Sequence, residues 1–158
     1  MMWRELENKH IPLFEELGIG FVPFAPLCKG FLSDAYDKNG FHVKLNAPRF
    51  SEEALKKNQV VVDLVNKIAK EKKAIVAQIS LAWVLAQKDF IVPIPGTTKL
   101  ERLKENIKAT EIKFTKAEVE SMNEALSQMN IEVEDLNQIQ ILKKELIYKG
   151  ETFSLFLL

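Results

Sequence analysis

Two short apolar runs alternate with helical stretches, and this alternation most constrains how the chain can fold. The runs are Gly20–Phe24 and Phe90–Ile94, and glycine or proline bounds each of them. Runs of this length are typical of buried strands. Because helical patterns lie before, between and after the two runs, the sequence predicts an α/β fold with parallel strands.

The helical stretches contain residues that typically break or end a helix, and apolar stripes that typically face a core. Residues 3–17 form the first of them, and Pro12, which has no N–H donor, is expected to interrupt this helix or to start a second piece. Gly18 stands where a helix C-terminal glycine is expected. Residues 52–72 predict an amphipathic helix whose apolar stripe is Val61, Leu64, Val65, Ile68 and Ala69.

Three further helices follow. Residues 76–87 are apolar almost all round, which predicts burial on most sides. Thr98 with Glu101, and Thr115 with Glu118, have the spacing of a capping box, so a helix is expected to start at each threonine. The helix after Thr98 has an apolar face made of Leu100, Leu103 and Ile107.

Two segments lack these regular patterns. Residues 25–50 form a long connection rich in Gly, Pro, Asp and Asn, and irregular connections of this length are often functional. Residues 132–149 could form a helix, and residues 153–158 are strongly apolar.

Composition excludes several classes of protein. The 158 residues carry 22 basic and 22 acidic side chains, so no net charge draws the chain to nucleic acid or to an anionic membrane. No apolar run approaches the ~20 residues of a membrane-spanning helix, and the first residues lack the apolar core of a secretory signal. The single cysteine excludes an intramolecular disulfide framework and a cysteine-rich zinc site. We therefore expect a cytoplasmic protein without a metal.

The stretch Ile91–Asn106 is the strongest candidate for a binding site. It reads as a strand, a tight turn at residues 95–98 and a helix start, which together form an anion site. Lys99, Arg102 and Asn106 share one helical face, and Arg102 is able to hold a phosphate monoester through two parallel N–H bonds. The alternative is an ordinary capped helix with a solvated basic face.

The stretch Phe24–Gly30 is the second candidate. It follows the first apolar run and opens the long connection, and its proline and glycine would let the backbone approach a ligand closely. The alternative is a simple turn.

Taken in order, these motifs resemble the C-terminal half of an aldo-keto reductase. The resemblance runs from about Trp3 to Leu126, and its most specific parts are Glu16–Leu32, Pro48–Phe50, Ala77–Gln87 and Ile91–Asn106. The family fold is a (β/α)8 TIM barrel, and the two runs resemble its strands seven and eight. The resemblance thus implies that residues 1–127 form a partial barrel and residues 128–158 a divergent tail, helical with an apolar end. Such barrels place a phosphate site after strands seven and eight.

The resemblance also implies a role in binding NADP(H) for twelve residues. The residues that resemble the holders of the adenosine 2′-phosphate are Gly96, Thr97, Thr98, Lys99 and Arg102. Those that resemble the adenine contacts are Glu105 and Asn106. Those that resemble the loop over the pyrophosphate are Ala25, Pro26, Leu27, Lys29 and Gly30. Ala25 stands where serine is more usual, which removes one hydroxyl contact. Lys99 and Arg102 favour NADP(H) over NAD(H), because the 2′-phosphate gives them a charge to neutralise.

The family's catalytic Asp, Tyr, Lys and His all belong to the first half of the barrel, and this chain matches none of them. The residues His10, Tyr36, His42 and Tyr148 fit no catalytic motif. The resemblance therefore implies a truncated NADP(H)-dependent oxidoreductase of aldehydes and ketones that is inactive alone. The alternative is a non-catalytic module that binds NADP(H), phosphate or another protein.

Half a barrel would also leave surface uncovered. Two strands expose their edges, and the apolar helix of residues 76–87 would keep an uncovered side. The expected partners are therefore the missing N-terminal half of the barrel or a second copy of the chain.

Overall fold

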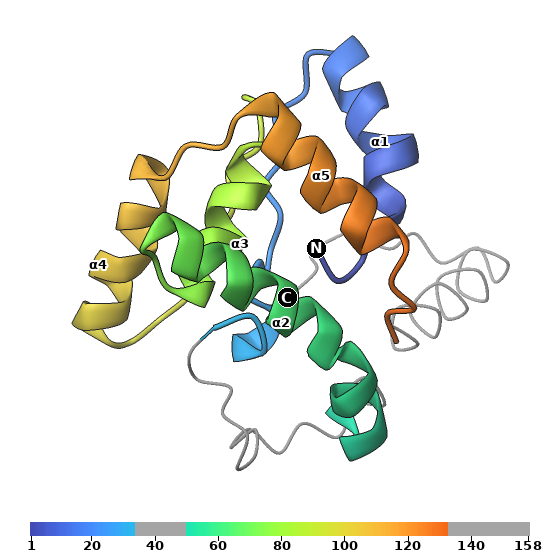
Figure 1. The fold of residues 1–158 in the computed structure, drawn as a ribbon. Coiled ribbons are helices and arrows are strands. Elements are labelled where there is room, and N and C mark those ends of the chain that lie inside the picture. The colour runs from blue at the N-terminus through green and yellow to red at the C-terminus, as the bar shows by residue number, and fades with distance from the viewer. Residues whose placement is uncertain (34–49, 133–158) are drawn as a thin grey trace, which may run out of the picture.

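The computed structural model describes residues 1–33 and 50–132, and Figure 1 shows their arrangement. This part of the chain is mainly helical. Its elements are α1 (Glu5–Glu16), the 3-10 turn η1 (Cys28–Gly30), α2 (Glu52–Lys72), α3 (Val76–Leu85), α4 (Leu100–Lys108), the 3-10 turn η3 (Ala109–Glu111) and α5 (Lys116–Ser127). Most of the long connection, the helix expected at 132–149, the apolar end at 153–158, Tyr36, His42 and Tyr148 lie outside the described residues.

The two apolar runs lie side by side and run parallel, as predicted. Phe21 bridges to Ile91, and Phe24 bridges to Ile94. The backbone N–H of Phe21 donates to the Phe90 oxygen at 2.9 Å, and the N–H of Val92 donates to the Phe21 oxygen at 2.9 Å. This pairing joins the segment after α1 to the segment after α3.

The pairing is limited to isolated bridges, so within the described residues neither run forms a continuous strand. Pro23 explains this, because the ladder would need an N–H at this position to donate to the Val92 oxygen, and a proline has none. The prediction of buried strands was wrong for one side of the pair. Ile91 is buried, but Val22, Phe24, Val92 and Ile94 are exposed.

Helix α1 runs through Pro12 without interruption, so the prediction of a break or a second piece was wrong. Pro12 cannot donate to the carbonyl of Asn8, but Asn8 is exposed and water can take the place of the missing donor. Gly18 ends the helix as predicted, with φ of 64°. The N–H of Ile19 donates to the Phe14 oxygen at 2.8 Å, as in a glycine-terminated helix.

Helices α2 and α3 build the core. The predicted stripe of α2 is confirmed, since Val61, Val65 and Ala69 are buried and Leu64 and Ile68 pack against the core. Helix α3 is buried along most of its length, also as predicted. The uncovered side expected for α3 is absent over Val76–Trp83, because α2, α4 and η3 all contact this helix.

One of the two predicted capping boxes forms. At α5, Thr115 Oγ1 accepts from the Glu118 N–H at 3.2 Å, and Glu118 Oε2 accepts from the Thr115 N–H at 2.7 Å. Hydrogen bonds from Lys72 and from the Thr115 backbone hold the pKa of Glu118 below its usual range. The box at Thr98 is absent, and α4 begins one residue later, with Lys99 at its N-cap. The reason is that Thr97 Oγ1 accepts from the Lys99 N–H at 3.2 Å and closes the turn there.

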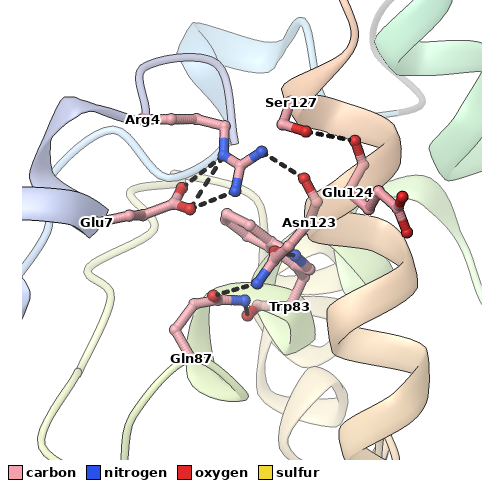
Figure 2. A network of polar contacts seen from close by, with 7 residues as sticks. All are labelled: Arg4, Glu7, Trp83, Gln87, Asn123, Glu124 and Ser127. Atoms are coloured by element: carbon pink, nitrogen blue, oxygen red, sulfur yellow. Dashed lines mark hydrogen bonds and ion pairs between the residues drawn. The ribbon is translucent and has the colours of Figure 1, made fainter.

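A polar network ties the start of α1 to α3 and α5 (Figure 2). Arg4 Nε donates to Glu7 Oε1 at 2.8 Å, and Arg4 Nη1 donates to the backbone oxygen of Asn123 at 2.7 Å. The side chain of Asn123 accepts from Trp83 Nε1 at 2.9 Å and donates to Gln87 Oε1 at 3.1 Å. Asn123 is thus the residue that links all three elements.

We predict that Asn123→Leu lowers the free energy of unfolding by about 1–3 kcal/mol, because the buried indole N–H of Trp83 loses its acceptor. Urea denaturation measures this change. Glu120→Ala, at an exposed position of the same helix, is the control and should stay within about 0.5 kcal/mol of the wild type. Equal stabilities of the two variants would show that the network does not stabilise the fold.

Candidate functional site

The two predicted site segments leave the same end of the paired runs. Phe24 and Ile94 form the last bridge, and Ala25 and Pro95 follow them directly. Neighbouring chains in a sheet lie about 4.8 Å apart. The loop that leads into η1 and the turn that leads into α4 therefore start next to each other, although they are far apart in the sequence.

The loop before and within η1 has an unusual backbone. Ala25, Cys28 and Lys29 have φ values of 47°, 48° and 53°, in the left-handed region that non-glycine residues rarely adopt. Each such residue costs roughly 1 kcal/mol, and such conformations cluster at ligand-binding segments. Phe31 and Leu32, which are both buried, anchor the end of the loop in the core.

The other predicted residues of this loop lie partly at the surface. Pro26, Leu27 and Gly30 are half-buried, whereas Ala25 and Lys29 are exposed. Gly30 has a φ of 101°, which only glycine adopts readily. Its N–H donates to the Leu27 oxygen at 2.9 Å, so the loop is closed by its own backbone.

The turn before α4 leaves open space for a ligand. A Cβ added at Gly96 would meet no atom within 4 Å, so packing within the protein does not require glycine there. The N-cap of α4, Lys99, makes no side-chain capping bond. No capping side chain therefore satisfies the N–H groups of the first turn. Thr97 accepts from Lys99 but keeps its own hydroxyl proton, and Thr98 is exposed.

Lys99 and Arg102 lie near this turn as unneutralised cations. Both are exposed, and neither forms an ion pair with another described residue. A positive pair at a helix N-terminus favours an anion, because the helix dipole has the same sign.

Glu105 and Asn106 lie deeper than the basic pair. The backbone oxygen of Glu105 accepts from Gln78 Nε2 at 3.1 Å, which holds α4 against α3. Asn106 is only 9% exposed, and its side-chain amide makes no hydrogen bond with any residue in the described part of the chain. A buried amide without a partner costs about 1–3 kcal/mol, so a ligand that bonded to it would recover that loss.

Two features of the site carried no sequence signal. Ala25 and Cys28 are not residue types that indicate a left-handed backbone, and the helical pattern around Asn106 did not show its burial.

Among the described residues no group of three His, Cys, Asp or Glu side chains could hold a metal ion. Over the same residues, no helix has the length and apolarity needed to cross a membrane.

Comparison with known proteins identifies the family. The family described as "Aldo/keto reductase family" matches residues 1–127, so the chain belongs to the aldo-keto reductase family. "Probable aldo-keto reductase 1" of Glycine max is 40% identical over 129 residues, which are 79% of this chain and 37% of that relative.

The solved structures that this chain resembles include the following two. The thermostable aldo-keto reductase Tm1743, crystallised with the inhibitor epalrestat, has a TM-score of 0.54 and 27% identity over 78% of this chain and 36% of that one. The glycerol dehydrogenase AKR11B4 of Gluconobacter oxydans has a TM-score of 0.72 and 19% identity, which shows a similar fold, over 83% of this chain and 41% of that one. This chain thus spans well under half the length of each relative.

We predict that Asn106→Leu raises the free energy of unfolding, by about 1 kcal/mol, because an apolar group of similar size replaces a buried amide that has no hydrogen-bond partner among the described residues. Asn58→Leu is the matched control. Asn58 is also buried, but its amide donates to the Glu132 oxygen at 3.1 Å and accepts from the Glu132 N–H at 2.8 Å. The control should therefore lose stability in urea denaturation. An equal loss in both variants would contradict the view that Asn106 lacks a partner.

Proposed function

We propose that this chain is the NADP(H)-binding part of an oxidoreductase that interconverts carbonyl compounds and alcohols, and that it does not turn over substrate alone. The observation that carries the proposal is the position of Lys99 and Arg102, unneutralised by any described residue, at the uncapped start of α4. This helix start adjoins the strained loop that begins at Ala25. Membership of the aldo-keto reductase family supports the same cofactor.

In this proposal Gly20–Phe24 and Phe90–Ile94 correspond to strands seven and eight of a (β/α)8 barrel, and the chain acts in the cytoplasm. The parallel bridges between the two runs, and the place of the site just after them, support the correspondence. Residues 128–158 would then be an addition to the family domain, which matches only residues 1–127.

The residues present fit the cofactor. Arg102 would hold the 2′-phosphate with two N–H groups, and Lys99 would add charge from the helix N-cap. Gly96 leaves room for a close approach, and the Thr97 and Thr98 hydroxyls are able to donate. The Asn106 amide, which no described residue bonds, would bond to the adenine, beside Glu105. NADPH, when bound, would supply a hydride for carbonyl reduction.

The loop at Ala25–Gly30 would cover the pyrophosphate through backbone groups. Ala25 offers no hydroxyl, so the contact there is left to the backbone and to Lys29. Three left-handed residues fix the direction in which these groups point, which is the kind of preorganisation that a phosphate contact needs.

A second candidate function is a non-catalytic binding or interaction module. The observation that favours it is a set of exposed apolar side chains on the paired runs, which would suit contact with another polypeptide. The two candidates share the cofactor site and differ in whether a catalytic partner exists.

We predict that Arg102→Ala lowers the affinity for NADPH about tenfold to hundredfold and leaves the affinity for NADH unchanged. The lost charge-assisted hydrogen bonds, about 1.5–3 kcal/mol, are made only to the 2′-phosphate. Isothermal titration with NADPH, NADH and adenosine 2′,5′-bisphosphate measures the effect. Lys104→Ala, an equal change of charge at an exposed position of the same helix, is the control and should bind all three as the wild type does. Absence of NADPH binding, or equal losses in both variants, would overturn the phosphate site.

We further predict that the purified 158-residue chain does not oxidise NADPH in the presence of aldehydes or ketones. It has no match to the family's catalytic Asp, Tyr, Lys and His, so nothing at the site would protonate the carbonyl oxygen. The decrease of absorbance at 340 nm on addition of a panel of carbonyl compounds checks this. Turnover that co-purifies with the chain and is abolished by Arg102→Ala would show that the chain is a complete enzyme.

A further inference from the structure

The side chain of Gln78 joins two helices. Gln78 lies in the first turn of α3, and its Oε1 accepts from the backbone N–H of Ile75 at 3.2 Å, as the third residue of a capping box does. Its Nε2 donates to the backbone oxygen of Glu105, in α4, at 3.1 Å. Because one partner is a donor and the other an acceptor, the two bonds together fix the orientation of the amide.

Helix α4 has few other attachments. Within the described part of the chain, the bond from Gln78 is the only hydrogen bond that joins α4 to another α-helix. Asn106 is the one residue of α4 that is buried, and the turn before the helix contains Gly96, which has open space beside it. The position of α4 and its rotation about its own axis therefore depend on Gln78.

The side chains that would hold the adenosine 2′-phosphate lie on this same helix. Arg102 comes three residues before Glu105, about 4.5 Å along the helix axis, and Lys99 is the N-cap. Asn106, which would contact the adenine, directly follows Glu105. In a helix of only 9 residues, a shift or rotation at Glu105 moves all of these side chains together.

We propose that Gln78 is a positioning residue of the cofactor site, whose bond to Glu105 fixes the helix that carries Arg102 and so sets the preference for NADP(H) over NAD(H). The inference rests on the proposed function, because it takes the start of α4 as the 2′-phosphate site. Two parallel N–H bonds from a guanidinium to a phosphate require a fixed geometry, and an anchored helix has less freedom to lose when the ligand binds. The alternative is that Gln78 only stabilises the start of α3 through Ile75.

Three variants of the full 158-residue chain separate positioning from stability. Gln78→Met removes both bonds without a change of charge. Gln78→Glu keeps an acceptor for the Ile75 N–H and loses only the donor to Glu105, because a carboxylate has no proton to donate.

Gln87→Met is the matched control. Gln87 also makes two side-chain hydrogen bonds, donating to the Trp83 oxygen at 2.9 Å and accepting from Asn123 at 3.1 Å, and neither of them reaches α4. The control therefore loses as many bonds as Gln78→Met but leaves the attachment of α4 intact.

Isothermal titration with NADPH and NADH measures the affinities, and circular dichroism melting measures the stability. We expect both Gln78 variants to lower the affinity for NADPH about threefold to tenfold, which is the effect of one hydrogen bond, and the affinity for NADH less. The ratio of the two affinities should therefore fall. Gln78→Glu should melt close to the wild type, whereas Gln87→Met should melt at a lower temperature and keep the wild-type ratio.

An unchanged ratio in Gln78→Met, or an equal change in Gln87→Met, overturns the proposal in favour of a purely structural role. A loss confined to Gln78→Glu overturns it in favour of charge repulsion. If Gln78→Met fails to fold, Gln78→Glu decides alone at low and high salt, because salt screens repulsion by a carboxylate but does not return a displaced helix to its place. A ratio that high salt restores then overturns the proposal.

The wild-type chain tests the proposed function separately. A wild-type chain that binds neither nucleotide, or both equally, overturns the 2′-phosphate site and this inference with it. A wild-type chain that prefers NADPH leaves the proposed function standing whatever the Gln78 variants show, so the two failures are distinguishable.

Discussion

The parallel contact of Phe21–Phe24 with Ile91–Ile94 is the interaction on which the arrangement of the molecule depends. It is the contact that places the loop after the first run beside the turn after the second. Two bridges are too few to be stable alone, since even a two-stranded hairpin is marginal in water. Burial of the Ile91 side chain, which is only 3% exposed, stabilises the pair further. The arrangement of the site therefore depends on this burial as well as on the two bridges.

Where a local pattern decides the structure, the sequence was sufficient. The stripe of α2 and the box at Thr115 each depend on residues within a few positions of one another. Prediction failed where the outcome depends on more distant surroundings. Whether Pro12 breaks α1 depends on the exposure of the Asn8 carbonyl, which no local pattern contains. Before α4 the adjacent hydroxyls of Thr97 and Thr98 can each accept from a backbone N–H. Spacing alone cannot show that Thr97 is the one that accepts and closes the turn.

The candidate site also contains residues that the sequence could identify and residues that it could not. The turn at Gly96 and the basic pair after it are contiguous in the sequence and could be identified there. The burial of Asn106 could not, because an asparagine in a helix has the same pattern whether it faces water or the core. Nor could the left-handed backbone at Ala25, since alanine gives no sign of it. The parts missed are those that tertiary contacts impose.

The candidate site and a set of exposed apolar side chains both lie on the same pair of runs. The carboxyl end of the pair carries the loops that would hold NADP(H), and one side of the pair carries Val22, Phe24, Val92 and Ile94. Any molecule that binds either place only when the pair is formed stabilises the pair, and so favours binding at the other place.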